Sequence, residues 1–583
     1  MKPVRLAAAA TIALPRWALF GLGLLYILPG LIGRDLWKED AGSFGIMWSM
    51  AQGGLHDWLA PHIAGLPVSD EGPLAFWLGA LSIKLFGWLL GDVMAARVST
   101  IGVFVLGTMS VWYTAFHLGR RPEAQPLRLA FGGQPEPNDY GRTLADTAAL
   151  IYLGCLGLLQ FSHDPLAVTL QGSLLAFFLY RAVRYVETPS VRNAALIGLS
   201  LGALILSRGW LTPLVLALTL LLCTRFLAMP VARTVAHVAQ AGTAALVIAA
   251  LWIVPALLLP SAMSPVEQWM AWNLNQVGLP TLATLKSFFR VGIWFFWPAW
   301  PFAAWAIYAW RRQSHLLHIV LPLSFIVALS LLIICDPLLE SGDLLKLLPP
   351  LAIMAAFGLP TMKRGTINAI DWFSVIVLSM MAALVWVYYV AKLTGVPAQF
   401  AKNVLKLVPG FVPQLSVLPV AVAAIATLGW LVLVQWRISR QPSVLWRAVV
   451  LSSGGLILIW VLAMTLFIPE INYARSYAST ARELAARVPA GSNCIDSNVG
   501  RAQRASFAYY GRLPFANQRA DQCNLLLLQD SVRVPDSKEM LDEHGHLKWA
   551  LLWEGRRPSD RDERFRLYKR LPEAQRHGRA LGK

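Results

Sequence analysis

The sequence predicts a polytopic α-helical membrane protein that ends in a small α/β domain, and three observations carry this prediction. Hydrophobic residues make up 56% of the 583 residues and charged residues only 14%, which is typical of a chain that has lipid as its solvent. Apolar runs of membrane length recur from Trp17 to Ile468, and in lipid they must be helical because every backbone N–H and C=O group needs an internal partner. The last stretch, 469–583, is polar and charged, which indicates a separate domain.

The apolar runs predict about thirteen transmembrane helices in a membrane domain of residues 1–468. The predicted spans are 17–33, 93–117, 144–161, 165–184, 193–207, 210–228, 235–258, 288–310, 316–335, 345–361, 370–391, 411–436 and 445–468. An odd number of spans places the two ends of the chain on opposite sides of the membrane.

The net charge of +18 is distributed by loop. With the N-terminus in the cytoplasm, basic residues such as Arg120, Arg121, Arg311 and Arg312 fall inside, and the acidic clusters fall outside. The positive-inside rule explains these charges better than nucleic-acid binding, so we expect no nucleic-acid partner. We expect a monomer in the bacterial inner membrane, surrounded by membrane lipids, with the domain 469–583 in the periplasm.

Segment 73–91, PLAFWLGALSIKLFGWLLG, is apolar enough to be counted as a further span. Counting it would invert every later loop and place the arginines outside. We therefore predict that this segment, like the amphipathic stretch FGIMWSMAQGGL before it, lies in the outer membrane interface, where Trp and Phe are favourable.

The first outer loop, 34–92, concentrates carboxylates in a chain with only 32 acidic residues. Its first forty residues hold Asp35, Glu39, Asp40, Asp57, Asp70 and Glu71. Such a loop beside the outer leaflet suits general-base chemistry, capture of a cation or binding of a divalent metal ion. Asp57 and Asp70 taken singly are equally compatible with helix caps and turns. The adjacent pair Glu39 and Asp40 is the stronger candidate for a membrane-level cavity.

The run EDAGSFGIMWSMAQGGLHDWLAPHIAGLPVSDEGPLAFWLGALSIKLFG resembles the first outer loop of GT-C type membrane glycosyltransferases, in the aminoarabinose transferase and protein O-mannosyltransferase-like group. That group typically reads DE, then GDW, then EKPPLYYWL, then LFG. Here the acidic pair is reversed, HDW replaces GDW, and Gly72 stands where the group has a basic residue. The runs QFSHDPLAV, LSRGW and SGDLLKLLPPLAIMAAFGL are similar to later elements of the group.

The resemblance implies a GT-C enzyme that transfers a sugar, with inversion, from a polyprenyl-phosphate carrier to an acceptor at the outer face, which is a lipid A-like lipid, a glycan or a protein. Glu39 corresponds to the acidic residue that serves as base, with Asp40 beside it and Asp164 as the acid after the third span. Arg208 and Lys346 are the candidates for binding the leaving phosphate.

A carboxylate to take the acceptor proton and cations to hold the phosphate are the groups that such a displacement needs. Asp57, Asp70, Glu71 and His163 are candidates for the acceptor cavity. We expect no resident metal or cofactor, although His163 beside Asp164 leaves a divalent cation open.

Two other functions fit parts of the pattern. A lipid or lipid-linked sugar transporter would place charges at mid-membrane depth and would often show an internal repeat, whereas here the acids gather at one face. A non-catalytic receptor or assembly subunit would tolerate loss of Glu39 and Asp40.

In the domain 469–583 the stretches 475–488 and 501–511 predict helices, and NCID, NLLLLQ, HLKWALLW and RFRLYKR predict short strands. This α/β domain contains Cys494 and Cys523, which could pair if the domain is extracytoplasmic. It has no nucleophile motif, so we expect it to cap the active face or to recruit the acceptor.

Overall fold

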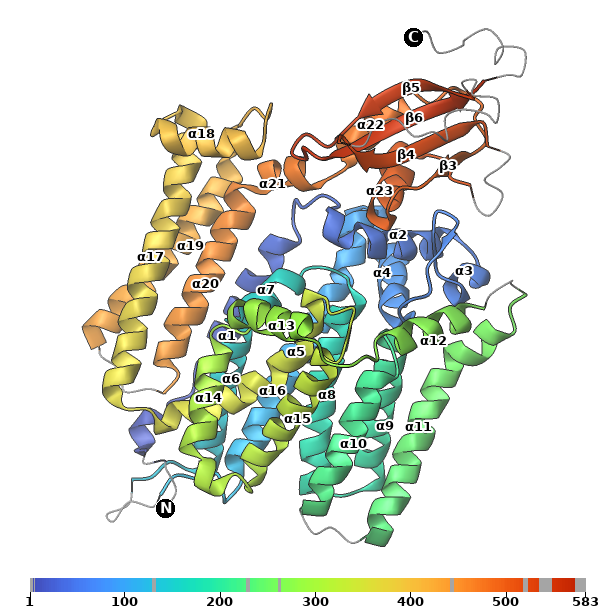
Figure 1. The fold of residues 1–583 in the computed structure, drawn as a ribbon. Helices are drawn as coiled ribbons and strands as arrows, with labels where there is room; N and C mark the ends of the chain where they lie inside the picture. The colour runs from blue at the N-terminus through green and yellow to red at the C-terminus, as the bar shows by residue number, and fades with distance from the viewer. Residues whose placement is uncertain are drawn as a thin grey trace.

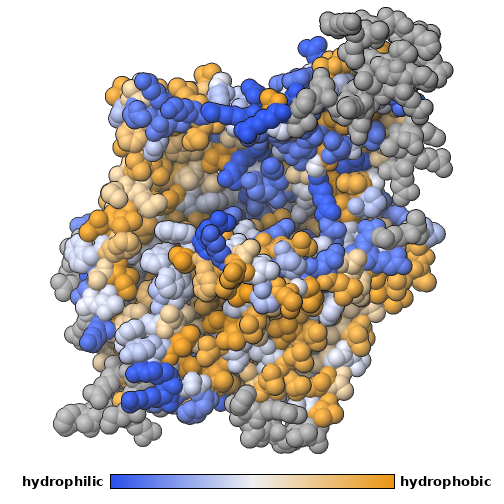
Figure 2. Space-filling model, in the orientation of Figure 1, coloured by the Kyte–Doolittle hydropathy of each residue, from blue (hydrophilic) through white to orange (hydrophobic). Residues whose placement is uncertain are grey.

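A computed structural model gives the fold, and it describes residues 4, 6–127, 133–226, 231–260, 264–440, 445–516, 523–533 and 548–571. The chain forms a helical bundle with a sheet-containing C-terminal domain above one end, while the N-terminus lies at the opposite end (Figure 1). The bundle surface is mainly hydrophobic, and hydrophilic residues gather in the hollow beneath the C-terminal domain (Figure 2). This is the architecture of a polytopic membrane protein.

Helices occur in all thirteen predicted spans. They are α1 (Arg16–Ile27), α5 (Asp92–Arg120), α6 (Pro137–Leu153), α7 (Leu156–Phe161), α8 (Ala167–Glu187), α9 (Val191–Ser207), α10 (Leu211–Phe226), α11 (Val231–Leu257), α13 (Leu282–Phe295), α14 (Ala299–Ala309), α15 (Leu317–Ile334), η4 (Ser341–Leu347) with α16 (Leu348–Gly358), α17 (Arg364–Thr394), α19 (Val417–Arg440) and α20 (Arg447–Leu466). Within the described ranges, seven helices are long and apolar enough to cross a membrane, and α1, α4, α9 and α10 are shorter apolar helices.

Two predicted spans are interrupted, and the two interruptions meet. The span 144–161 breaks at Gly154 and Cys155, and the span 288–310 breaks before Pro298, whose ring nitrogen cannot donate to a continuing helix. Restarting α7 frees the amide of Leu156, which donates to the carbonyl of Trp297 at 3.1 Å. The backbone groups released at one break are thus partly satisfied by the other.

The first outer loop forms a compact layer. It contains α2 (Lys38–Gln52), α3 (Leu55–Leu59), the two-residue strands β1 (His62–Ile63) and β2 (Leu66–Pro67), and α4 (Leu74–Leu90). Gly91, whose φ of 76° is easy only for glycine, separates α4 from α5. Helix α4 is therefore an element of its own that packs on α2 and α5, with Gly79 against the sulfur of Met47.

Two further helices lie outside the predicted spans. Helix α12 (Pro265–Asn275) follows α11, and α18 (Ala398–Leu407) follows α17 on the same side as the C-terminal domain (Figure 1). Both occupy loops that the span prediction left without secondary structure.

The C-terminal domain has the predicted α/β composition. It contains α21 (Ile468–Arg475), α22 (Ala478–Ala485), β3 (Ile495–Ser497), α23 (Arg501–Gly511), β4 (Leu525–Ser531), β5 (Trp549–Gly555) and β6 (Glu563–Arg570). The sheet order is β3-β4-β6-β5, with β3 parallel to β4 and the other pairs antiparallel. A buried core that includes Phe507, Leu527 and Phe565 joins the helices to the sheet. Cys494 and Cys523 form a disulfide, which settles the pairing that the sequence left open.

The C-terminal domain is fastened to the first outer loop. Helix α23 packs on α2, and the buried guanidinium of Arg504 donates to the carbonyls of Ile63 and Ala64 at 3.0 and 2.8 Å. Tyr510 donates to the carboxylate of Asp35. These contacts hold the domain directly over the acidic loop.

Candidate active site

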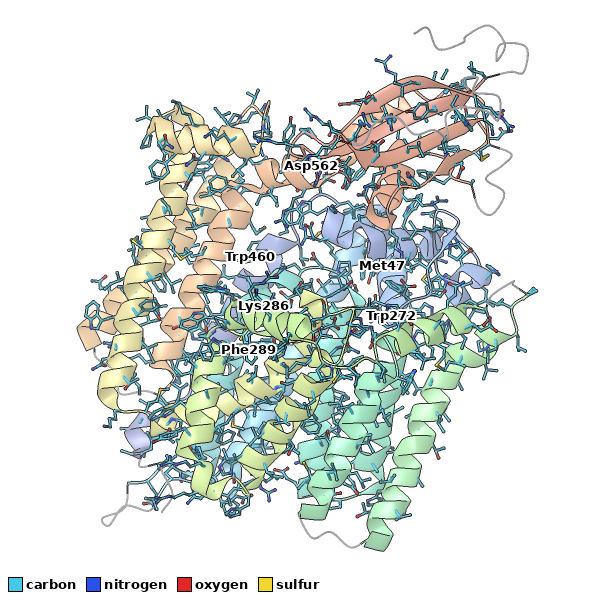
Figure 3. All side chains as sticks on the ribbon, viewed as in Figure 1. Met47, Trp272, Lys286, Phe289, Trp460 and Asp562 are labelled. Atoms are coloured by element: carbon cyan, nitrogen blue, oxygen red, sulfur yellow. A yellow bond between two sulfur atoms is a disulfide. The ribbon has the colours of Figure 1, made fainter. Side chains whose placement is uncertain are left out.

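A cavity of about 840 Å³ lies where the first outer loop meets α7, η4, α20 and α21. Its charged lining residues are Arg34, Glu39, Glu71, Asp164, Arg208, Glu340 and Arg475. Leu156, Leu159, Trp460 and Met464 add an apolar side. Figure 3 labels Trp460 on α20. Four predicted site residues, Glu39, Glu71, Asp164 and Arg208, therefore line a single cavity.

Among the cavity carboxylates that come from the first outer loop, Glu39 has the more exposed side chain. It lies in the first turn of α2, its side chain is 48% exposed, and it accepts from Arg475 of α21 at 3.4 Å. This contact is long and Arg475 is itself half exposed, so the pair is loosely held. A carboxylate in this position can accept a proton from an incoming hydroxyl.

Asp40 points the other way, behind the wall of the cavity. Its carboxylate accepts from the Nε and Nη2 of Arg97 at 3.0 and 2.6 Å, and both side chains are 1% exposed. It also accepts from the amide of Trp37, which caps α2. Arg97 in turn donates to the carbonyls of Arg34 and Asp35 at 2.7 Å each. Asp40 is thus placed to hold the loop that presents Glu39, rather than to touch a ligand in the cavity.

Arg34, which was not among the predicted site residues, links the loop to Asp164. Its guanidinium contacts the carboxylate of Asp164, lies 3.4 Å from Asp40 and stacks 3.9 Å from the ring centre of Trp37. Burial raises the pKa of Asp164 to about 6, although Arg34 opposes this shift. Within the part of the chain that the structure describes, the buried Nε of Arg34 has no hydrogen-bond partner. Arg34 is the first charged residue after a membrane span, and this was the sequence feature that could have identified it as a site residue.

Arg208 anchors the opposite wall. Its Nε donates to Glu71 at 2.6 Å and its Nη1 donates to Asp343. Burial raises the pKa of Glu71 despite this contact. Burial alone would lower the pKa of Arg208, but Asp343 and Glu71 outweigh it and raise the pKa. The guanidinium is therefore fully charged.

Lys346 does not line the cavity. Its Nζ donates to the same oxygen of Asp343 at 2.9 Å, and its side chain is buried. Lys346 therefore lies behind Arg208, and Asp343 lies between the two cations. The cation pair predicted for a phosphate is present, but only Arg208 reaches the cavity.

His163 is fully buried beside the cavity and does not line it. Its Nε2 lies 2.9 Å from the carbonyl of Tyr26 and its Nδ1 lies 3.1 Å from the hydroxyl of Ser162, so the Nε2 carries the proton. Its ring packs on Trp460 at 4.5 Å between ring centres. Burial lowers the pKa of His163 to about 4, so the imidazole is neutral. We assign it a role in packing.

Asp57 and Asp70 lie apart from the cavity. Asp57 accepts from the amide of Gly54 at the start of α3 and from His62 at 3.0 Å. Asp70 pairs with Arg501 of α23. Asp57 thus has the cap role that the sequence left open, whereas Asp70 joins the first outer loop to the C-terminal domain. No group of three or more His, Cys, Asp and Glu side chains is placed to hold a metal ion among the described residues.

Comparison with solved structures identifies the fold. ArnT from Cupriavidus metallidurans bound to undecaprenyl phosphate superposes with a TM-score of 0.67 over 94% of this chain and 97% of that chain, at 16% identity. The same protein in the apo state gives a TM-score of 0.66. The chain therefore has the GT-C fold. This confirms the fold class that the first outer loop suggested.

Sequence similarity to curated proteins is local. An undecaprenyl phosphate-alpha-4-amino-4-deoxy-L-arabinose arabinosyl transferase 2 from Pseudomonas fluorescens is 35% identical over 106 residues, which cover 17% of this chain and 18% of the relative. The corresponding transferase from Yersinia enterocolitica is 28% identical over 203 residues, or 33% of this chain and 31% of the relative. The chain thus aligns with about a fifth to a third of these proteins. No protein-family model matches it.

Proposed function

We propose that this protein is a membrane glycosyltransferase that moves a sugar from a polyprenyl-phosphate carrier to an envelope acceptor, on the periplasmic side of the inner membrane. The observation that carries the proposal is one cavity lined by a loosely held carboxylate, Glu39, and a charged guanidinium, Arg208. Similarity to transferases named for undecaprenyl phosphate-linked aminoarabinose supports this donor class.

The proposed reaction is a displacement at the anomeric carbon. The acceptor oxygen forms a bond to that carbon while the bond to the carrier phosphate breaks, and the bonding electron pair leaves with the phosphate. Glu39 takes the acceptor's proton. Arg208 binds the phosphate as its charge grows, and Lys346 supports this from behind Asp343. A single displacement of this kind inverts the configuration of the sugar.

Arg34 and Asp164 occupy the space between these two groups. Arg34 lines the cavity and adds positive charge to it, and Asp164 holds the guanidinium in place. Asp40 and Arg97 position the loop that carries both Arg34 and Glu39. The apolar lining by Leu159, Trp460 and Met464 suits the first isoprene units of the carrier.

Transfer by the purified full-length protein in detergent tests the proposal. A labelled polyprenyl-phosphate sugar and an envelope lipid extract should yield a labelled product without a sealed compartment, which a transporter would require. E39Q should lose this product. D562N should retain it, because Asp562 is an exposed residue of the C-terminal domain (Figure 3). Mass spectrometry of envelope lipids from cells with and without the protein would identify sugar and acceptor. No product from wild-type protein with any such donor would refute the proposal.

A further inference from the structure

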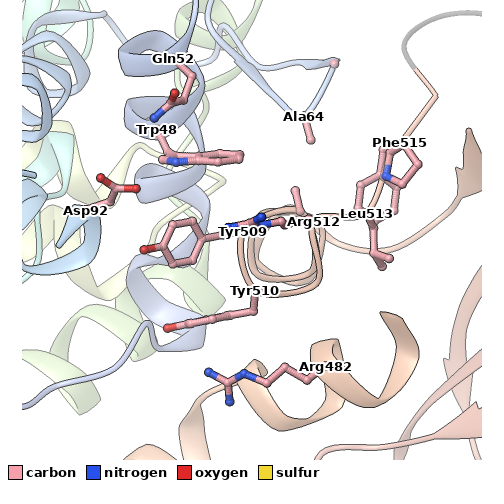
Figure 4. A pocket seen from close by; sticks show the side chains of 13 residues that line it. Trp48, Gln52, Ala64, Asp92, Arg482, Tyr509, Tyr510, Arg512, Leu513 and Phe515 are labelled. Atoms are coloured by element: carbon pink, nitrogen blue, oxygen red, sulfur yellow. The ribbon is translucent and has the colours of Figure 1, made fainter. Parts of the chain in front are cut away.

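A second cavity, of about 920 Å³, lies between α2 and the C-terminal domain (Figure 4). It shares no lining residue with the candidate active site. Tyr510 on the wall of the second cavity donates to the carboxylate of Asp35, the residue after Arg34 of the first cavity. The second cavity is therefore distinct from the candidate active site.

One wall of this cavity is aromatic. The rings of Trp48 and Tyr509 lie 5.5 Å apart between centres at 83°, and those of Tyr509 and Tyr510 lie 5.0 Å apart at 70°. Figure 4 shows the three side chains one above another, with Phe515 across the cavity. All three remain partly exposed. Aromatic rings left open in a concave site present an apolar face together with polar edges, which matches the C–H face and the hydroxyl rim of a sugar ring.

The same cavity contains two exposed arginines. Arg482 lies beneath Tyr510, with its guanidinium carbon 5.4 Å from the ring centre, and Arg512 follows the end of α23. Neither makes an ion pair with a carboxylate in the described part of the chain. With Asp92 as the one carboxylate among the lining residues, the two guanidinium groups leave the cavity with a net positive charge, which favours an anionic ligand, and their planar donor geometry suits a phosphate.

The backbone at Arg512 supports a role for its side chain. Arg512 has a φ of 49°, in the left-handed region where glycine or asparagine is the usual residue after a helix. A non-glycine residue there is conformationally unfavourable, and such residues cluster at ligand sites. Gln52 and Asp92 on the same cavity supply an amide and a carboxylate for hydroxyl groups.

We propose that this cavity binds a phosphorylated saccharide, with the sugar ring on the wall of Trp48, Tyr509 and Tyr510 and the phosphate on a guanidinium at one end of that wall, Arg482 or Arg512. A free phosphate would leave the aromatic wall unused, and an uncharged sugar would leave the arginines without partners. The site does not depend on the transferase activity proposed above, because its occupancy is measured by binding.

Equilibrium dialysis of labelled glucose 6-phosphate against the full-length protein in nanodiscs tests this site. We expect saturable binding that is at least about tenfold tighter than that of glucose or inorganic phosphate. R482Q combined with R512G should weaken binding about tenfold or more, and glycine suits the left-handed backbone at that position. R487Q, at an exposed arginine just beyond α22, is the matched control and should bind as wild type. E39Q should also bind normally, because it alters the other cavity.

Equal binding by wild type and the R482Q/R512G variant would overturn the proposal, as would inorganic phosphate binding as tightly as glucose 6-phosphate. Nanodiscs that contain lipid A distinguish the two sources of such a ligand. Competition by lipid A assigns the site to a lipid headgroup, and unaffected binding assigns it to a soluble saccharide.

Discussion

Glu39 and Asp40 are adjacent carboxylates in opposite environments, so their amide variants should fail in different ways. Asp40 and Arg97 are each 1% exposed and share two hydrogen bonds. Disrupting a buried ion pair by removing one charge costs about 3–5 kcal/mol of folding free energy. Glu39 and Arg475 are about half exposed and 3.4 Å apart, and such a pair contributes about 0–1 kcal/mol. We therefore expect D40N to be strongly destabilised and E39Q to be nearly as stable as wild type.

Activity should show the reverse order when it is corrected for the folded fraction. Loss of a general base lowers a rate by about 10²–10⁴-fold, so E39Q should lose transfer while its melting temperature stays close to that of wild type. Thermal unfolding in detergent and initial transfer rates measure both effects. In a double-mutant cycle of D40N with R97Q, the effects on the free energy of unfolding should be strongly coupled. Each single variant leaves the remaining buried charge without its ion-pair partner. If D40N were as stable as E39Q, the positioning role assigned to Asp40 would be wrong.

Four further outcomes are expected. R208K should raise the KM for the donor about tenfold or more in initial-rate assays, because an ammonium group cannot reproduce the fork between Glu71 and the phosphate site. Burial raises the pKa of Asp164 to about 6, so the native state binds an extra proton between about pH 4 and 6. The free energy of unfolding therefore falls as pH rises through that window, and D164N should remove this slope from the profile of melting temperature against pH. Replacing Cys494 and Cys523 by Ser should cost the C-terminal domain about 3.5 kcal/mol, from closure of a 29-residue separation, and limited proteolysis should then cleave it faster. Tags in the α5–α6 connection and at the C-terminus should be labelled from opposite sides of the membrane, and labelling from one side would contradict the topology.

The sequence predicted the helical elements well, because apolar length and charge at the loops are properties of each segment alone. It did not predict the breaks at Gly154 and Pro298. The residues that permit a break were visible, but the hydrogen bond from Leu156 to Trp297 that compensates the exposed backbone joins segments far apart in the chain.

The residues of the candidate site were likewise predicted only in part from the sequence. Glu39 and Arg208 were predicted from a motif and a turn, and both line the cavity. Asp40 is adjacent to Glu39, and Lys346 shares Asp343 with Arg208, but neither lines the cavity, and a motif does not say which way a side chain points. Arg475 was missed because its partner lies more than 400 residues earlier in the chain.

Arg475 has a consequence for biosynthesis. It belongs to α21, which leads into the C-terminal domain, yet it faces the carboxylate presented by the opening turn of α2. An isolated bridge between Trp37 and Ser476 joins the same two segments. The first turn of α2 is synthesised early, whereas α21 is synthesised only after nearly 470 residues. The wall that α21 adds to the candidate active site therefore forms only when most of the chain has been made. A nascent chain that stalls before α21 would carry the acidic loop in the membrane without the wall that confines a substrate to it.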